Sequence, residues 1–249
     1  MASKDIRIVQ ISDCHLPADT SQSYRQINPH ENLQILMQKV RALKPDLLLA
    51  TGDLSEDGSL ASYRSLTRIF NALRVQVLAL PGNHDDPGLL ADAFPGSPVD
   101  TISVSEHGSW RIIRLNSSLA GKPEGRISER AVDELEGFLA HHENAPCLVA
   151  LHHQPVMINS PWIDKYPLMK PDNFLKLIDQ YSNVKAVVWG HIHQVFESQR
   201  AGVTMLGGPS SAINGIREAQ KFTPDGAGPA FRWLVLNANG SLRSGIVRG

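Results

Sequence analysis

The sequence has little cysteine, no long apolar run and almost no net charge. Its two cysteines, Cys14 and Cys147, form no C-x-x-C pair, so neither a disulfide framework nor a thiolate metal site is predicted. No apolar run approaches the roughly 20 residues that span a bilayer, and the start of the chain has no hydrophobic signal core. We therefore expect a soluble, cytoplasmic protein with no membrane partner.

The balance of charge excludes a further class of partner. A formal net charge of −1 with 20% charged residues gives no basic surface that would hold nucleic acid by bulk electrostatics. The hydrophobic fraction of 42% is ordinary for a globular protein and allows a sizeable core. At 249 residues one or two domains are compatible with the length. Because no linker-like segment divides the chain, we expect a single domain over residues 1–249.

The first third of the chain alternates β-rich apolar runs with helical periodicity. Strands are predicted at Ile6–Ile11, Asp46–Ala50 and Gln76–Leu80, and helices at Asn32–Leu43 and Leu60–Leu73. A polar loop follows the carboxyl end of each of these strands. Such repeated strand–loop–helix units are typical of a mainly parallel sheet.

The remainder of the chain mixes helices with strands that are joined by short turns. The predicted elements are a hairpin of Val99–Ser105 and Trp110–Asn116, helices at Ser128–His141 and Phe174–Tyr181, strands at Cys147–Leu151 and Val184–Trp189, and C-terminal strands at Val195–Gln199, Val203–Leu206, Phe231–Leu236 and Leu242–Val247. Parallel units followed by antiparallel strands predict an α/β fold in which two mixed sheets pack face to face. With helices outside, this is a four-layer α/β/β/α sandwich.

Metal-binding side chains recur at the carboxyl ends of five predicted strands. They are Asp13 and His15, Asp53, Asn83 and His84, His152, and His191 and His193. Asp-Cys-His, Gly-Asn-His-Asp and Gly-Asp are each typical of an ordinary turn, whereas the two histidines around Ile192, directly after a buried strand, have little structural purpose. Their repetition at the strand ends, where open α/β sheets bind ligands, is what indicates a function.

The chemistry of these side chains favours transition metals. Imidazole, carboxylate and amide oxygen together, without cysteine, suit Mn, Fe or Zn. Seven ligands are too many for one tetrahedral centre and fit two ions that share a bridging carboxylate. We therefore predict two divalent or trivalent ions per chain, with Fe or Mn as the first choice and Zn as the alternative.

The ordered set of motifs resembles the calcineurin-like metallophosphoesterases, which carry a dinuclear centre in an α/β/β/α sandwich. The motifs are Asp13-x-His15, Gly52-Asp53-x-x-x-Asp57, Gly82-Asn83-His84-Asp85, His152 and Gly190-His191-x-His193. Within this superfamily the chain is most similar to the class III cyclic-nucleotide phosphodiesterases. The narrower resemblance rests on Asn116-Ser117-Ser118, His152-His153-x-Pro155, Trp162-x-Asp164, Gly190-His191-x-His193-Gln194 and Gly208-Pro209-Ser210-Ser211.

The resemblance implies a role for each residue of the set. Asp13, His15 and His193 would hold the first ion, Asn83, His152 and His191 the second, and Asp53 would bridge both. His84 would act as a catalytic proton donor or charge stabiliser facing the substrate phosphate, and Asn83 and His193 would also contact the substrate. Asp57 and Asp85 would lie behind the ligands and fix the orientation of their rings.

The activity implied by the resemblance is hydrolysis of 3′,5′-cyclic AMP to AMP by a hydroxide that bridges two metal ions. The metal motifs recognise only the phosphate, so another small diester stays open: a glycerophosphodiester, a 2′,3′-cyclic nucleotide or a nucleotide-linked lipid precursor. Lys170 and Ser210-Ser211-Ala212 depart from the cyclic-AMP members, and we expect these positions to affect contacts near the base or ribose. A non-catalytic scaffold is the third alternative.

Two features are interpreted as packing, and the assembly is left open. Cys14 should point away from the ions, and Trp162 is interpreted mainly as burial of apolar area, with stacking on a base as the alternative. The partner is expected to be a small phosphodiester, a cyclic nucleotide above all, and not a nucleic acid. The chain is expected to be a monomer or a homodimer.

Overall fold

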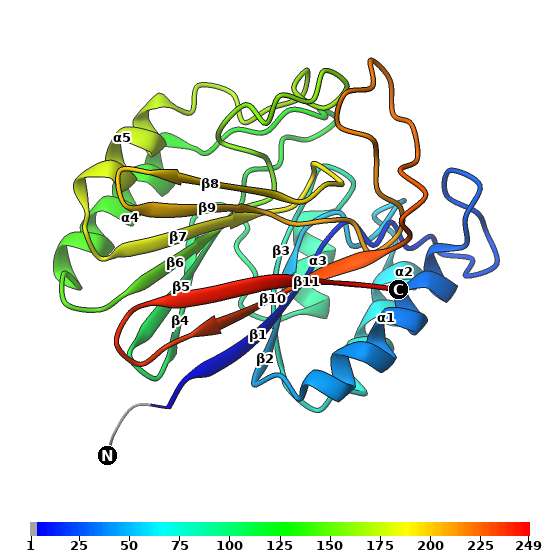
Figure 1. Cartoon of the computed structure of the whole chain (residues 1–249), viewed down its shortest axis with the longest axis horizontal. Helices are drawn as coiled ribbons and strands as arrows, with labels where there is room; N and C mark the ends of the chain where they lie inside the picture. Colours follow the sequence, from blue (N-terminus) through cyan, green and yellow to red (C-terminus); the bar gives the residue numbers. More distant parts are fainter. Residues whose placement is uncertain (1–3) are drawn as a thin grey trace.

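The computed structural model describes residues 4–249 as eleven strands and five helices. The strands are β1 (Ile6–Ile11), β2 (Leu47–Thr51), β3 (Gln76–Leu80), β4 (Ile102–His107), β5 (Trp110–Leu115), β6 (Cys147–Ala150), β7 (Val184–Trp189), β8 (Phe196–Arg200), β9 (Val203–Gly207), β10 (Ala230–Leu236) and β11 (Leu242–Arg248). The helices are α1 (Pro29–Leu43), α2 (Leu60–Asn71), α3 (Pro87–Ala93), α4 (Glu129–His141) and α5 (Asp172–Gln180) (Figure 1). None of these helices is long and apolar enough to cross a membrane.

Both sheets are mixed, as predicted. One has the order β11-β10-β1-β2-β3, with β1, β2 and β3 parallel and the C-terminal pair antiparallel. The other has the order β4-β5-β6-β7-β9-β8, with a parallel centre and antiparallel edge strands β4 and β8. The antiparallel C-terminal strands are thus shared between the two sheets.

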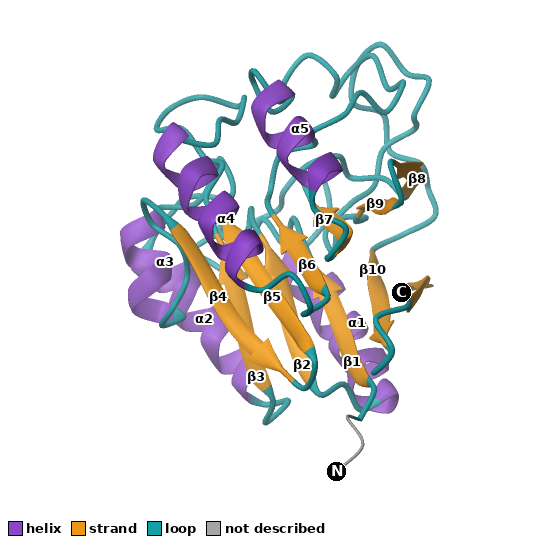
Figure 2. Ribbon diagram, turned by 90° about the vertical axis from the view of Figure 1, so that its left-hand side faces the viewer, coloured by secondary structure: helices purple, strands orange, loops and turns teal. Residues whose placement is uncertain are grey.

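Three layers of buried apolar side chains separate four layers of structure. Ile8, Leu49 and Ala150 belong to the layer between the two sheets. A second layer joins α1, α2 and α3 to the outer face of the first sheet, and a third joins α4 and α5 to the outer face of the other sheet. The two groups of helices lie on opposite sides of the paired sheets (Figure 2), which confirms the α/β/β/α sandwich.

Local capping explains where the helices begin. Asn28 accepts hydrogen bonds from the backbone N–H groups of His30 and Glu31, so α1 begins at Pro29, three residues earlier than predicted. Ser128 caps α4 by accepting from the N–H of Ala131, so this helix begins at Glu129, one residue later than predicted. The short helix α3 was not predicted, because only Leu90 of its seven residues is buried and no periodicity marks it.

The hairpin of β4 and β5 differs from its predicted boundaries. His107 pairs with Trp110, which leaves only Gly108 and Ser109 in the turn, whereas the predicted turn began at Glu106. Gly108 has a φ of 54°, a conformation that two-residue hairpin turns require. Strand β4 therefore extends to His107, two residues further than predicted. It starts at Ile102, three residues later than predicted.

The parallel strands of both sheets end at the same edge of the sandwich. The loops that follow them gather at the end of the molecule opposite the start of β1 (Figure 2). Buried hydrogen bonds hold the two sheets in register there: Gln10 donates to the carbonyl of Trp189 over 2.9 Å, and the backbone N–H of His191 donates to Asp13 Oδ2 over 3.0 Å. The sandwich thus brings strand ends from both sheets to one place.

A buried arginine forms a second link between the sheets. Arg232 of β10 donates to the carbonyl oxygens of Gly207 and Phe196 in the other sheet and to the carboxylate of Glu197, over 3.1, 3.4 and 2.6 Å. Its side chain is fully buried. Removing it would take a donor from the buried carbonyl of Gly207 and from the part-buried carbonyl of Phe196, and a buried acceptor that loses its donor costs more than the net value of the hydrogen bond.

We predict that Arg232→Leu lowers the free energy of unfolding by about 2 kcal/mol, because buried carbonyls at β8 and β9 lose their donor. Urea unfolding followed by circular dichroism measures this change. Arg243→Leu on β11 is the matched control: Arg243 is exposed, and its replacement should change stability by less than about 0.5 kcal/mol. Equal stability of the two variants would contradict the prediction.

Candidate metal centre

The predicted ligands lie on turns with an unusual backbone conformation. Asp13, His15, Asp53, His191 and His193 all have positive φ, between 45° and 66°. This left-handed conformation costs an L-residue with a Cβ about 1 kcal/mol, less for Asp and Asn, and persists where the surroundings determine it. It turns each side chain inward at the end of its strand, beyond what simple alternation along a strand would give.

Two glycines allow the turns to approach one another. A Cβ atom at Gly190 would collide with Ser12 Oγ and lie 2.8 Å from Asp13 Oδ2. A Cβ atom at Gly82 would collide with the carboxylate and backbone of Asp53. Only glycine fits at either position without moving a predicted ligand.

The first predicted set converges on a single point. His15 Nε2 lies 3.1 Å from His193 Nε2, and His193 Nε2 lies 3.4 Å from Asp13 Oδ1. Asp53 Oδ2 is 3.8 Å from His15 Nε2. These side chains come from the ends of β1, β2 and β7, so the first set draws on both sheets.

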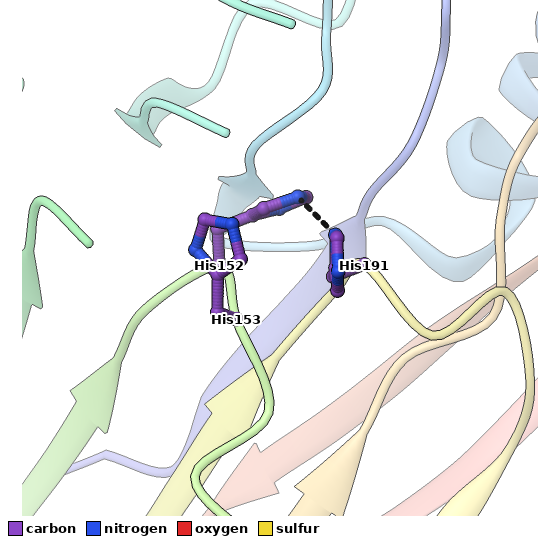
Figure 3. A group of neighbouring side chains, drawn as sticks. All are labelled: His152, His153 and His191. Carbon is purple, nitrogen blue, oxygen red and sulfur yellow. Dashed lines mark hydrogen bonds between the residues drawn. The ribbon is translucent and has the colours of Figure 1, made fainter. Parts of the chain in front are cut away.

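The second predicted set lies on the other side of Asp53. His152 Nε2 is 3.2 Å from Asn83 Oδ1, 3.4 Å from Asp53 Oδ2 and 3.2 Å from His191 Nδ1. Figure 3 shows the contact between the rings of His152 and His191. Because Asp53 Oδ2 approaches rings of both sets, its carboxylate occupies the position expected of a bridge.

The four histidine rings are all tied by their outward nitrogen to an oxygen. The partners are Glu56 Oε2 for His15 Nδ1, the carbonyl of Thr51 for His152 Nδ1, the carbonyl of Tyr166 for His191 Nε2, and the carbonyl of Ile213 for His193 Nδ1, over 2.7, 2.8, 3.0 and 2.7 Å. Since a carbonyl or carboxylate oxygen only accepts, each outward nitrogen carries the proton. When such a ring is neutral, its inward nitrogen is unprotonated and carries a lone pair.

The inward lone pairs fit metal ions. When both rings are neutral, two nitrogen lone pairs face each other at 3.1 Å in the first set and at 3.2 Å in the second, and they repel unless a metal ion or a proton lies between them. Metal–nitrogen bonds of about 2.1 Å place neighbouring ligands roughly 3.0–3.4 Å apart. The donor atoms therefore have the spacing and the orientation of two metal sites that share Asp53.

Burial and charge act on these groups in different directions. Burial lowers the pKa of His15, and it lowers the pKa of His191 to about 3, so both rings are neutral. Burial acts the same way on His152, but the charge of Asp53 outweighs it and raises the pKa to about 9. Despite its own burial, Asp53 has a pKa well below its usual range because of His152. The centre of the site therefore attracts cations, and an ion would displace the proton of His152.

His84 lies at the edge of this group and faces a cavity. Its backbone N–H donates to Asp53 Oδ1 over 2.9 Å, and its Nδ1 is 3.2 Å from Glu56 Oε2. Burial would lower the pKa of His84, but the hydrogen bond to Glu56 and the charge of Asp53 raise it to about 9. The Nε2–H of His84 is thus available as a proton donor.

Glu56 takes the place that the sequence analysis assigned to Asp57. Its carboxylate contacts the rings of both His15 and His84, and these contacts, against the effect of burial, lower the pKa of Glu56 to about 2. Asp57 contacts no ligand ring: it accepts hydrogen bonds from the backbone of Ala18 and Ser59. Both carboxylates follow Asp53 in one loop, and no sequence periodicity distinguishes which of them turns inward.

Asp85 supports the site through the backbone. It accepts from the N–H groups of Gly82, Leu54 and Ser55 and from the hydroxyl of Tyr63. It therefore fixes the turns that carry Asp53 and Asn83 and contacts no ligand ring.

The sequence analysis gave His153 no role. This residue is buried beside His152 and His191, and its Nδ1 lies 2.9 Å from Ser117 Oγ (Figure 3).

A cavity of about 350 Å³ opens over the predicted ligands, and Asn83, His84 and His193 line it. Trp162 is mostly buried, as expected, and also lines this cavity.

Lys170 does not line the cavity over the predicted ligands. It lines a separate hollow beside α4 and α5. Ser210 and Ser211 lie behind the site, where they donate to the Asp13 carbonyl and to Cys14 Sγ. None of these departures lines the cavity, so the structure gives no support to the expectation that they affect contacts near a base or ribose.

Comparison with known proteins identifies the family. The family model of the calcineurin-like phosphoesterases matches residues 6–195, which include every predicted ligand. The chain belongs to this family. A 3′,5′-cyclic-nucleotide phosphodiesterase of Nostoc is 38% identical over 98% of this chain and 92% of its own. The 3′,5′-cyclic adenosine monophosphate phosphodiesterase CpdA of Pseudomonas aeruginosa is 34% identical over 98% of this chain and 90% of its own.

Solved structures of phosphoesterases share the fold. A dimetal phosphatase from Danio rerio superimposes with a TM-score of 0.68 at 15% identity, covering 93% of this chain and 95% of its own. A purple acid phosphatase from yellow lupin gives a TM-score of 0.62 at 13% identity, covering 99% of this chain and 54% of its own. The predicted family and the predicted sandwich are confirmed.

We predict that Glu56→Gln weakens the first metal site by about 10- to 100-fold, because the His15 ring loses the carboxylate that orients it and raises its basicity. Calorimetric titration of the metal-free protein with Mn²⁺ measures the affinity. Asp57→Asn, one residue along the same loop, is the matched control and should change the affinity less than twofold. Equal weakening by both substitutions would show that the loop, and not Glu56, matters.

Proposed function

We propose that the chain is a metal-dependent phosphodiesterase that hydrolyses 3′,5′-cyclic AMP to AMP. The observation that carries the chemistry is that two pairs of imidazole nitrogens face each other, one pair on either side of Asp53, beneath a cavity. The curated relatives named as cyclic-nucleotide phosphodiesterases, which match nearly the whole chain, support the substrate.

The ligand sets follow from the donor atoms. Asp13, His15 and His193 would hold one ion and Asn83, His152 and His191 the other, with Asp53 shared between them. Two bound cations supply a nucleophilic water of lowered pKa and neutralise the charge of the phosphoryl oxygens. Iron and manganese are the metals we propose, with zinc as the alternative, because the set combines imidazole, carboxylate and amide oxygen.

The protein's own groups position the substrate and move a proton. Asn83, His84 and His193 line the cavity and would contact the phosphate. Glu56 holds the Nδ1 side of the His84 ring, which leaves Nε2–H to protonate the departing 3′ oxygen of the ribose. The remaining work is positioning and electrostatic stabilisation. Location in the cytoplasm and the choice between monomer and homodimer stay predictions.

Turnover of cyclic AMP by the Mn-loaded protein tests the proposal. We expect AMP as the product, loss of activity with a chelator, and recovery on adding Mn²⁺. Asp53→Asn should bind fewer than two ions per chain and lose at least about 1,000-fold in rate, because the shared carboxylate supplies charge to both sites. Cleavage of glycerophosphodiesters or 2′,3′-cyclic AMP, without cleavage of 3′,5′-cyclic AMP, would overturn the substrate. No cleavage of any diester by the two-metal protein would indicate a scaffold.

The role of His84 is tested by changing the leaving group. We predict that His84→Asn slows cyclic AMP hydrolysis by about 10²–10⁴-fold, because the 3′ alkoxide needs a proton. An aryl diester with a p-nitrophenolate leaving group needs none, so its hydrolysis should slow by less than about tenfold. His30→Asn on α1, outside the cavity, is the control and should change neither rate. Equal losses on both substrates would show that His84 stabilises charge and does not donate a proton.

A further inference from the structure

Two loops that are far apart in sequence meet over the cavity. One loop, residues 12–28, carries Tyr24 and Arg25, and the other, residues 208–229, carries Phe222. The Arg25 guanidinium carbon lies 4.1 Å from the centre of the Phe222 ring. The first loop carries the predicted ligands Asp13 and His15 at its start and none beyond them. The second loop carries no predicted ligand.

The first loop presents Arg25 on a strained tip. Tyr24 and Ile27 exchange both backbone hydrogen bonds, over 2.9 and 3.0 Å, so Arg25 and Gln26 form a two-residue turn. Both have positive φ, 48° and 70°. Such turns favour Asn-Gly, and a non-glycine pair there has a conformational cost. Strain of this kind persists where the surroundings enforce it and is concentrated at functional sites.

Ring contacts connect the two loops to the metal centre. The Tyr24 ring stacks on His15 with centroids 4.2 Å apart, and Arg25 Nε donates to the Tyr24 hydroxyl over 2.9 Å. On the other side the Phe222 ring stands edge-on to Trp162 and His193, at 5.1 and 6.0 Å. Arg25 is therefore separated from the predicted ligand His15 by one side chain, and Phe222 contacts the predicted ligand His193 directly.

The chemistry of this wall suits a flat, electron-rich group attached to an anion. Among the lining residues Arg25, Lys165 and Lys221 are cationic, and Asp53 is the only carboxylate. A guanidinium plane and an aromatic ring both stack on nucleobases. The ribose of a nucleotide separates its base from its phosphate by a distance comparable to one side chain.

We propose that Arg25 and Phe222 form the platform on which the nucleobase of the substrate stacks. This inference rests on the proposed function, because it concerns the same cavity, and it assigns nucleoside selectivity to the two loops. The phosphate lies at the predicted ligands and the base lies against the Arg25–Phe222 platform. The nucleoside part is then recognised without any contribution from the strand-end motifs.

The test compares two ligands that differ only in the base. AMP and ribose 5-phosphate are titrated calorimetrically into the Mn-loaded protein. We expect AMP to bind at least about tenfold more tightly than ribose 5-phosphate, since one base–aromatic stack is worth about that factor or more. Phe222→Leu and Arg25→Ala should each remove most of this preference while changing ribose 5-phosphate affinity less than twofold.

Three further variants separate stacking from a structural role. Phe222→Tyr keeps the ring and should keep the preference for AMP. The double variant Arg25→Ala/Phe222→Leu should lose little more than either single variant, because the two residues act as one unit. Phe138→Leu, on the outer helix α4, removes an aromatic ring that stacks on His142, away from the cavity, and should change neither affinity.

Each other outcome would overturn the inference. If the variants weaken AMP and ribose 5-phosphate equally, Arg25 and Phe222 support the fold of the site only. If AMP keeps its advantage in both single variants, the base lies elsewhere. Failure of the proposed function is distinguishable, because a protein that does not turn over cyclic AMP can still bind AMP in preference to ribose 5-phosphate.

Discussion

The structure depends on one electrostatic constraint, which is that imidazole nitrogens of the predicted ligands are held face to face. His15 and His193 point their Nε2 atoms at each other, and His152 and His191 repeat the arrangement on the other side of Asp53. Where both nitrogens are unprotonated their lone pairs repel, and a metal ion, or in the second set the proton of His152, relieves this repulsion. Without one, the rings would separate unless their outward nitrogens were fixed. The four outward hydrogen bonds, three of them to backbone carbonyls, supply that fixation.

The sandwich provides the rigid frame that these hydrogen bonds need. The carbonyl of Thr51, at the end of β2, accepts from His152, which follows β6 in the other sheet. The orientation of a ring on one sheet is therefore set by the position of the other sheet. The buried bonds from Gln10 and Arg232 keep the sheets from sliding. A fold built from one sheet would offer strand ends along a line, whereas two facing sheets surround a point.

The sequence was sufficient to predict the strand ends of this frame, because the same arrangement of a buried strand followed by a ligand recurs along the chain. Asp13, Asp53 and His152 each follow a buried strand, so their convergence could be predicted from strand order alone. The choice between Glu56 and Asp57 could not, because neighbouring loop residues differ only in backbone direction. Helix α3 was not predicted for a related reason, because its one buried residue, Leu90, produces no hydrophobic periodicity. Residues 208–229 offered no periodic pattern, and nothing in their order predicts that Phe222 meets Arg25.

The residues that would hold the metal ions differ from those that we propose to select the substrate. The predicted ligands lie on turns whose glycines, Gly82 and Gly190, exclude even a methyl group. The loops over the cavity carry no such restriction, because Arg25 is exposed and Phe222 only partly buried. Substitutions there can change which group is held beside the phosphate without moving a ligand. Ser210 and Ser211 show the opposite case, since they brace Asp13 and Cys14 from behind. Selectivity among small diesters is therefore to be sought in the loop residues that hold no metal ion, such as Arg25 and Phe222.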